Sequence, residues 1–200
     1  MNKEELLESL KKKEFPPMII EAFATVNREL FLPEHLKLYA SEDIALPIED
    51  GTTTSQPSTI ALMLNLANIE ANHRILEVGS GSGYVLALLA YLAPEGDIYG
   101  IDMNQKIAIK TKNLLTDQKN IHILIRNGIQ GLPEHAPFNR IIVSASAQDL
   151  TILNPLIAQL HDPGILVAPV KDSIFQIKKA NGQIEKNEFP GFAFVPLKNE

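Results

Sequence analysis

The chain has 200 residues, 45% of them hydrophobic, and its 24 acidic and 18 basic residues give a net charge of −6. At roughly 150 residues per domain this length predicts one domain, and the apolar fraction excludes wholesale disorder. The negative charge argues against a broad nucleic-acid or anionic-membrane surface, and the absence of cysteine excludes disulfides and thiolate nucleophiles.

The N-terminal part of the chain predicts a helical cap over the remainder. Apolar residues recur at helical spacing in residues 3–13, and residues 18–26 predict a second helix after a pair of prolines. Prolines are scattered between residues 28 and 54 without a sustained period. We therefore expect irregular structure between this cap and the next helix.

Strands alternate with helices from residue 74 onward. Strands are predicted at residues 74–78, 98–102, 121–126 and 140–145, and helices at residues 84–93, 104–116 and 152–160. Such alternation implies right-handed crossovers and a parallel sheet that is covered on both faces.

The C-terminal part consists of strands with little room for helices between them. We predict four, in ILVAPV, SIFQIKK, QIEKNEF and FAFVPL, with Asn181-Gly182 as a type I′ hairpin turn. The expected fold class is therefore α/β, a Rossmann-like sandwich. Its sheet is mostly parallel, with antiparallel C-terminal strands and an N-terminal helical cap.

A glycine-rich loop, GSGSG, joins the first of the alternating strands to the helix after it. Open parallel sheets bind ligands at the carboxyl ends of their strands, and glycine permits both a sharp turn and close approach of a ligand to the backbone. Asp102 ends the next strand, where a carboxylate can accept hydrogen bonds from both hydroxyls of a ribose. An ordinary turn for the loop, and an ordinary strand-end or helix N-cap acid for Asp102, are the plain alternatives.

The spacing of the glycines separates two kinds of nucleoside cofactor. The dinucleotide pattern G-x-G-x-x-G needs a third glycine at position 84, where this chain has tyrosine. The observed G-x-G-x-G is typical of sites for S-adenosylmethionine (SAM). A nicotinamide oxidoreductase is therefore the less favoured alternative.

Two runs together resemble the protein-L-isoaspartate O-methyltransferase family. GTTTSQP (51–57) is similar to the family pattern G-x-T-x-S-Q-P, and LEVGSGSGY (76–84) to L-E-x-G-[ST]-G-S-G-Y. Further stretches agree in order and spacing: VNRELFLP (26–33), NGIQG (127–131), APFNRIIVSA (136–145), PGILVAPV (163–170) and FVPL (194–197). The resemblance covers residues 15–198.

The resemblance implies an enzyme that transfers a methyl group from SAM to the carboxylate of isoaspartyl residues in damaged proteins, which initiates their repair. A carboxylate is already ionised at pH 7 and needs no base. The enzyme has to align it with the methyl group and exclude water. We therefore expect no catalytic triad and no metal site.

The resemblance also implies roles for individual residues. Ser55 matches the family's active-site serine beside the reacting carboxylate, although it can instead cap the helix that follows. Thr53 is a second substrate contact or a plain turn residue. The cofactor is assigned to Glu77, Gly79, Ser80, Gly81, Gly83, Asp102, Asn127 and Gly128.

Some positions depart from the family pattern. Asn127 replaces the aspartate that accepts from the adenine amino group, and its amide oxygen can still accept that bond. Asn139 replaces an aspartate in A-P-F-D, and we expect both asparagines near the site. Asp102 replaces a glutamate, which shortens the reach to the ribose.

We predict a single domain over residues 1–200, in which residues 1–57 form the helical cap and substrate-side segment and residues 58–200 form the cofactor-binding core and C-terminal strands. Isoaspartyl proteins and peptides are the expected partners, without nucleic acid or membrane. Residues 1–15 lack an apolar signal core, so we expect a cytoplasmic protein. A SAM-dependent methyltransferase of another acceptor and a non-catalytic SAM-binding descendant of the family are the alternatives.

Overall fold

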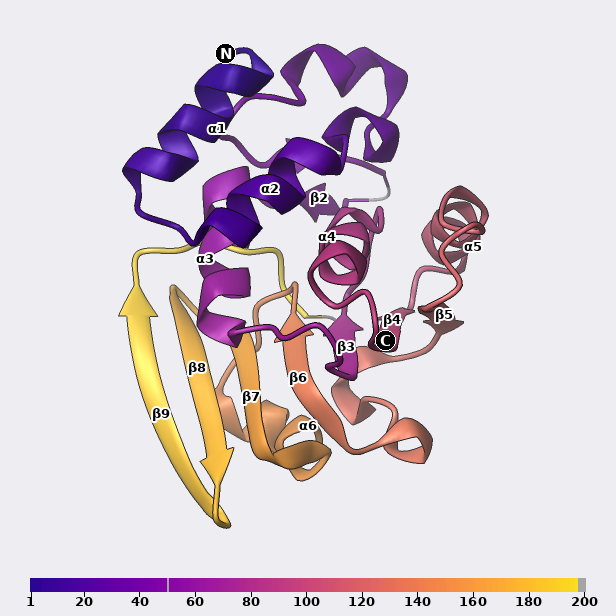
Figure 1. The fold of residues 1–200 in the computed structure, drawn as a ribbon. Helices are drawn as coiled ribbons and strands as arrows, with labels where there is room; N and C mark the ends of the chain where they lie inside the picture. The colour runs from indigo at the N-terminus through magenta and orange to yellow at the C-terminus, as the bar shows by residue number, and fades with distance from the viewer. Residues whose placement is uncertain (50, 198–200) are drawn as a thin grey trace.

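A seven-stranded sheet with the order β5-β4-β3-β6-β7-β8-β9 forms the centre of the computed structural model, which describes residues 1–49 and 51–197 (Figure 1). Residues 198–200, the end of the predicted domain, lie outside the described residues. The strands are β3 (Ile75–Val78), β4 (Ile98–Asp102), β5 (Ile121–Ile125), β6 (Phe138–Val143), β7 (Leu160–Val170), β8 (Ser173–Ala180) and β9 (Gln183–Pro190). Strands β3 to β7 are parallel, and β8 and β9 continue the sheet antiparallel.

Neighbouring residues of the central strands face opposite sides of the sheet and so enter two different cores. Ile75 belongs to the core shared with the N-terminal helices, whereas Leu76 belongs to the core on the other face. The first core includes residues of α3 (Pro57–Ala67) and α4 (Tyr84–Leu92), and the second includes those of α6 (Asn154–Ala158). Helix α5 (Gln105–Leu114) contacts β4 and β5. The sheet is therefore covered on both faces, as predicted.

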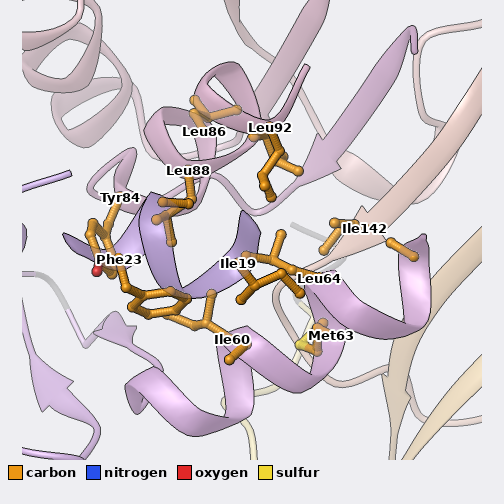
Figure 2. Packing of buried hydrophobic residues seen from close by; sticks show 14 of the residues in the cluster. Ile19, Phe23, Ile60, Met63, Leu64, Tyr84, Leu86, Leu88, Leu92 and Ile142 are labelled. Atoms are coloured by element: carbon orange, nitrogen blue, oxygen red, sulfur yellow. The ribbon is translucent and has the colours of Figure 1, made fainter. Parts of the chain in front are cut away.

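The N-terminal cap consists of α1 (Lys3–Lys12), α2 (Pro17–Thr25), two 3-10 helices at Arg28–Phe31 and Glu34–Tyr39, and the short hairpin of β1 (Leu46–Pro47) and β2 (Thr53–Thr54). Figure 2 shows Ile19 and Phe23 of α2 beside Ile60 of α3 and Tyr84 of α4. The rings of Phe23 and Tyr84 meet edge to face at 6.1 Å. Apolar burial therefore fixes the cap on the core.

One predicted strand is wrong. Residues 192–197 form no strand. The Phe192 amide donates to the Asp172 carbonyl, and further along the segment bridges the chain after β6, where the Ser146 amide donates to Val195 and the Leu197 amide donates to Ser146. The chain leaves β9 at Gly191, which has a φ of 96°, and Pro196 has no N–H for a ladder. This tail therefore crosses to the carboxyl end of the parallel strands.

Other elements match their predictions with small shifts. Asn181 and Gly182 both have positive φ, as a type I′ turn requires. The helix predicted at residues 152–160 is a 3-10 turn, Leu150–Leu153, followed by the short α6. Among the described residues, no helix is long and apolar enough to cross a membrane.

Candidate active site

The carboxyl ends of β3, β4 and β6 surround a pocket of about 180 Å³. Strand β3 pairs with β4 on one side and with β6 on the other, so the order of the strands reverses at this point. Open α/β sheets bind ligands at such switch points. The C-terminal tail lines the pocket from one side through Val195 to Leu197, and the β1–β2 hairpin through Gly51 to Thr53.

The glycine loop forms one wall of this pocket, and its three glycines all have positive φ. A Cβ on Gly83 would lie 2.4 Å from Cγ2 of Thr111, so this glycine permits the contact between α4 and α5. A Cβ on Gly81 would meet no atom closer than 3.9 Å. Gly81 therefore leaves open space where a ligand approaches the backbone, while Gly83 serves packing.

Asp102 lies buried at the end of β4 and faces the same pocket. Its Oδ2 accepts from the Gly81 amide at 2.8 Å, and its Oδ1 accepts from the Asn104 amide at 2.9 Å. The start of α5 is capped by the Asn104 side chain, so Asp102 is not the cap. Each carboxylate oxygen keeps a further acceptor position, so Asp102 can fix the loop and also accept from a ribose.

Asn127 and Gly128 follow β5 on the adjoining side of the pocket. Gly128 lines the pocket, and a Cβ there would lie 2.4 Å from Cγ1 of Val78. The Asn127 amide oxygen accepts from the Ile129 amide at 3.0 Å and so caps the 3-10 turn Gly128–Gln130. The side-chain amide of Asn127 is thus bonded to the backbone of this turn, next to Gly128 in the pocket lining.

A smaller pocket of about 40 Å³ adjoins the first one. Both are lined by Thr53, Gly79, Gly81 and Ser144. The smaller pocket also brings together Ser55 from the cap, Glu77 from β3 and Ser80 from the glycine loop. The structure therefore gathers at one edge of the sheet the predicted site residues from three separate segments.

Ser55 is half-buried, and its hydroxyl makes no hydrogen bond to another residue that the structure describes. Its carbonyl accepts from Arg28 at 3.1 Å. Asp43 caps α3 instead, since its Oδ1 accepts from the Ser58 amide at 2.8 Å. The capping role predicted as the alternative for Ser55 thus belongs to Asp43, and the hydroxyl of Ser55 is left available.

Sequence reasoning assigned no role to Arg28 or Asp43. The buried guanidinium of Arg28 donates to the carbonyls of Ala40, Glu42, Ile44 and Ser55 at 3.0 to 3.3 Å. It therefore ties the cap to the segment that carries Ser55. The signal available in the sequence was the run VNRELFLP, in which Arg28 is the basic residue.

Glu77 is almost fully enclosed, with 1% exposure. Its Oε1 accepts from the Ser144 hydroxyl at 2.8 Å, while Oε2 has no partner among the described residues. Burial raises the pKa of the Glu77 carboxyl well above its usual range; the charge of Asp102 adds to this and the bond from Ser144 opposes it. The buried hydroxyl of Ser80 also lacks a partner among the described residues.

The expectation that Asn139 lies near the site is wrong. Its Oδ1 accepts from the Arg74 amide at 2.8 Å, where β3 and β6 begin. Parallel strands place all their amino ends at the edge opposite the glycine loop. Asn139 therefore joins two strands at the far edge. Within the described part of the chain, no group of three or more His, Asp or Glu residues could hold a metal ion.

A Rossmann-like sheet with this glycine loop, an acid at the end of the next strand and a pocket at the switch point defines the class of SAM-dependent methyltransferases. The family model for protein-L-isoaspartate(D-aspartate) O-methyltransferase matches residues 1–200. The chain belongs to this family.

Similar proteins and structures agree with this assignment. A protein-L-isoaspartate O-methyltransferase of a Ruegeria species is 38% identical over 186 residues, which is 90% of this chain and 85% of that protein. The one from Thermosipho melanesiensis is 37% identical over 199 residues, 96% of this chain and 100% of its own.

Two solved structures share the fold over nearly the whole chain. A protein-L-isoaspartate O-methyltransferase superimposes with a TM-score of 0.90 at 25% identity, covering 99% of this chain and 66% of that one. The corresponding Plasmodium falciparum protein, solved with S-adenosyl-L-homocysteine, gives a TM-score of 0.85 at 26% identity and covers 100% of both chains.

Proposed function

We propose that this protein transfers the methyl group of SAM to the carboxylate of isoaspartyl residues in damaged proteins, the first step of their repair. The observation that carries the proposal is the pair of adjoining pockets, one lined by Asp102 and the other by Ser55, with Thr53 and Gly81 common to both. A methyl donor and an acceptor can thus be held side by side.

The residues of the larger pocket fit the cofactor. Asp102 offers acceptors for the ribose hydroxyls and Gly81 leaves room beside the backbone. We assign the adenine to Gly128, which lines the pocket, and to Asn127 beside it. The unpartnered Glu77 Oε2 and Ser80 hydroxyl suit the polar methionine end. SAM supplies an electrophilic methyl group when bound.

The acceptor side needs no general base because a carboxylate is ionised at neutral pH. The Ser55 hydroxyl can donate a hydrogen bond to that carboxylate and hold it in line. Burial raises the pKa of Tyr84, so this phenol stays neutral beside the reacting groups. Apolar walls formed by Ile60, Met63 and Ile142 exclude water, which strengthens electrostatic positioning.

The two parts of the chain have different roles in this proposal. We assign the acceptor contacts Thr53 and Ser55 to the segment 1–57 and the cofactor contacts to residues 58–200. The net charge of −6 supports a protein acceptor rather than a nucleic acid. Isoaspartyl proteins as partners and a cytoplasmic setting are parts of this same proposal.

The test is a methyl-transfer assay with labelled SAM and two peptides that differ only in one isoaspartyl or aspartyl residue. We expect base-labile methyl ester on the isoaspartyl peptide alone. Equal labelling of the two peptides would contradict the assigned acceptor. Binding of S-adenosylhomocysteine without transfer to either peptide would favour a non-catalytic descendant.

A further inference from the structure

Glu77 carries an unsatisfied carboxylate oxygen inside the protein. Its Oε1 accepts from the Ser144 hydroxyl at 2.8 Å, whereas Oε2 is buried without a partner among the described residues. The side chain lines the smaller pocket, next to the cofactor wall. Because an unpaired buried carboxylate is costly, Oε2 needs either a proton or a cationic ligand.

Among the residues that the structure describes, the groups around Glu77 supply no cation. Asp102 on β4 opposes its ionisation, and Ser144 after β6 favours it. Tyr84 on α4 stays neutral because burial raises its pKa, and α3 carries no titratable residue. Arg28 lies 6.0 Å from the centre of the Tyr84 ring and donates to backbone carbonyls instead.

We propose that Glu77 is a neutral carboxylic acid in the ligand-free protein and releases its proton to solvent when the ammonium group of the cofactor binds beside Oε2. The O–H bond of Glu77 breaks, the proton goes to water, and the carboxylate then accepts from the ammonium at Oε2 and from Ser144 at Oε1. This inference rests on the proposed function, since it concerns the same cofactor.

Proton release makes cofactor affinity depend on pH. Below the pKa of Glu77 in the ligand-free protein, binding must displace a proton, so affinity falls by about tenfold for each pH unit of acidification. Above that pKa the affinity is constant. The neutral acid also explains how the pocket tolerates Glu77 close to Asp102 before the cofactor arrives.

Calorimetric titration of S-adenosylhomocysteine in two buffers of different ionisation enthalpy counts the protons. At a pH below the pKa of Glu77 in the ligand-free protein, where affinity varies with pH, we expect about one proton released for each ligand bound. Adenosine lacks the ammonium group and should release none. Glu77→Gln replaces the neutral acid with a neutral amide of the same shape, so its binding should be weaker, release no proton and show little dependence on pH.

A pair of serine variants provides a matched control. Ser144→Ala removes the bond that favours the ionised carboxylate, so affinity should fall while proton release persists. The Ser146 hydroxyl bonds the carbonyls of Ala147 and Lys171 instead. Ser146→Ala should therefore match the unmodified protein in both readouts.

The outcomes test proton release by Glu77 separately from the proposed function. Binding of S-adenosylhomocysteine without proton release overturns this inference and leaves the proposed function standing. Equal proton release by Glu77→Gln or on binding adenosine also overturns it, because the proton then comes from another group. Absence of any S-adenosylhomocysteine binding overturns the proposed function itself. The comparison of the two ligands on the unmodified protein keeps the test decisive if Glu77→Gln does not fold.

Discussion

Ser55 and Asp43 both lie at the start of α3, and their substitution separates catalysis from capping. The Ser55 hydroxyl bonds no other described residue, so Ser55→Ala should change the free energy of unfolding by less than about 0.5 kcal/mol. If the hydroxyl orients the acceptor carboxylate, the same change removes a positioning contact of ~2–3 kcal/mol. Methyl transfer should then fall roughly 30- to 150-fold.

Asp43→Ala is the matched control for the same end of α3. It removes the acceptor for the Ser58 amide, a bond of 2.8 Å, and should lower the free energy of unfolding by about 1 kcal/mol. For a chain of this length that corresponds to a fall in Tm of about 2–4 °C. Turnover per folded molecule should change by less than about threefold, because the carboxylate of Asp43 does not line the acceptor pocket.

Initial rates on the isoaspartyl peptide, urea unfolding and calorimetric Kd values for S-adenosylhomocysteine, measured on one preparation of each variant, distinguish the two roles. We expect Ser55→Ala to lose methyl-transfer rate while it retains cofactor affinity and stability. Asp43→Ala should lose stability and retain the methyl-transfer rate. A Ser55→Ala protein that melts earlier but keeps its turnover would remove Ser55 from the active site.

Three further predictions concern the cofactor side. Burial raises the pKa of Glu77 above its unfolded value of 4.5, so the folded state holds a proton that the unfolded state loses. The ligand-free protein should therefore lose up to about 1.4 kcal/mol of stability per pH unit between that value and the pKa of Glu77 in the folded protein, and no more above it. Over the same pH range, melting curves should show the Tm of Glu77→Gln rising relative to that of the unmodified protein. Gly81→Val should abolish S-adenosylhomocysteine binding in calorimetry, whereas Gly83→Ala, which meets Thr111, should mainly lower the Tm. Asn127→Asp should preserve the affinity or improve it by on the order of 1 kcal/mol, since a carboxylate is the stronger acceptor.

Contrary results would locate the error in each case. A constant difference in melting between Glu77→Gln and the unmodified protein across pH would mean that Glu77 is ionised in the fold. Normal binding by Gly81→Val would place the ligand away from the loop. Markedly weaker binding by Asn127→Asp would show a site built around the amide.

The sheet and the glycine loop could be predicted because their signals are local. The strands beside the loop are short, nearly continuous apolar runs because both of their faces are buried, and the loop follows β3 directly. Asp102 could be placed by the same logic, because parallel strands end at one edge. These features require only the order of the elements and the period of the side chains.

The contacts that hold the acceptor side could not be predicted, because they join residues distant in sequence. Asp43 caps α3 by accepting from Ser58, which lies 15 residues later, and Arg28 reaches Ser55 across 27 residues. Asn139 is a different kind of error. It lies at the amino end of β6 and not at its carboxyl end, so the topology already placed it at the edge away from the loop.

The FAFVPL tail shows the limit of reading a strand from apolar residues. Its composition is that of a strand, but a strand also needs a partner with free hydrogen-bonding groups. Among the described residues its backbone bonds only Ser146 and, through the Phe192 amide, the carbonyl of Asp172. Its apolar side chains are explained by burial instead: Phe192 and Phe194 pack on the core that includes the N-terminal helices, and Leu197 lies at the cofactor pocket, 3.8 Å from the Cβ position of Gly128.

Methyl transfer to an ionised carboxylate depends on the distance between the carboxylate and the methyl group and on the exclusion of water. The contacts between the cap and the core therefore affect the rate directly. Within the cap, Arg28 holds the segment of Ser55 at 3.1 Å. Thr111 on α5 donates to the Gly81 carbonyl at 2.7 Å, and Lys106 on the same helix pairs with Glu49 of the hairpin at 2.5 Å. The acceptor side and the donor side are thus both attached to α5 through separate contacts. The relative position of the two pockets therefore follows from how the cap packs on the core, which no motif within either segment encodes.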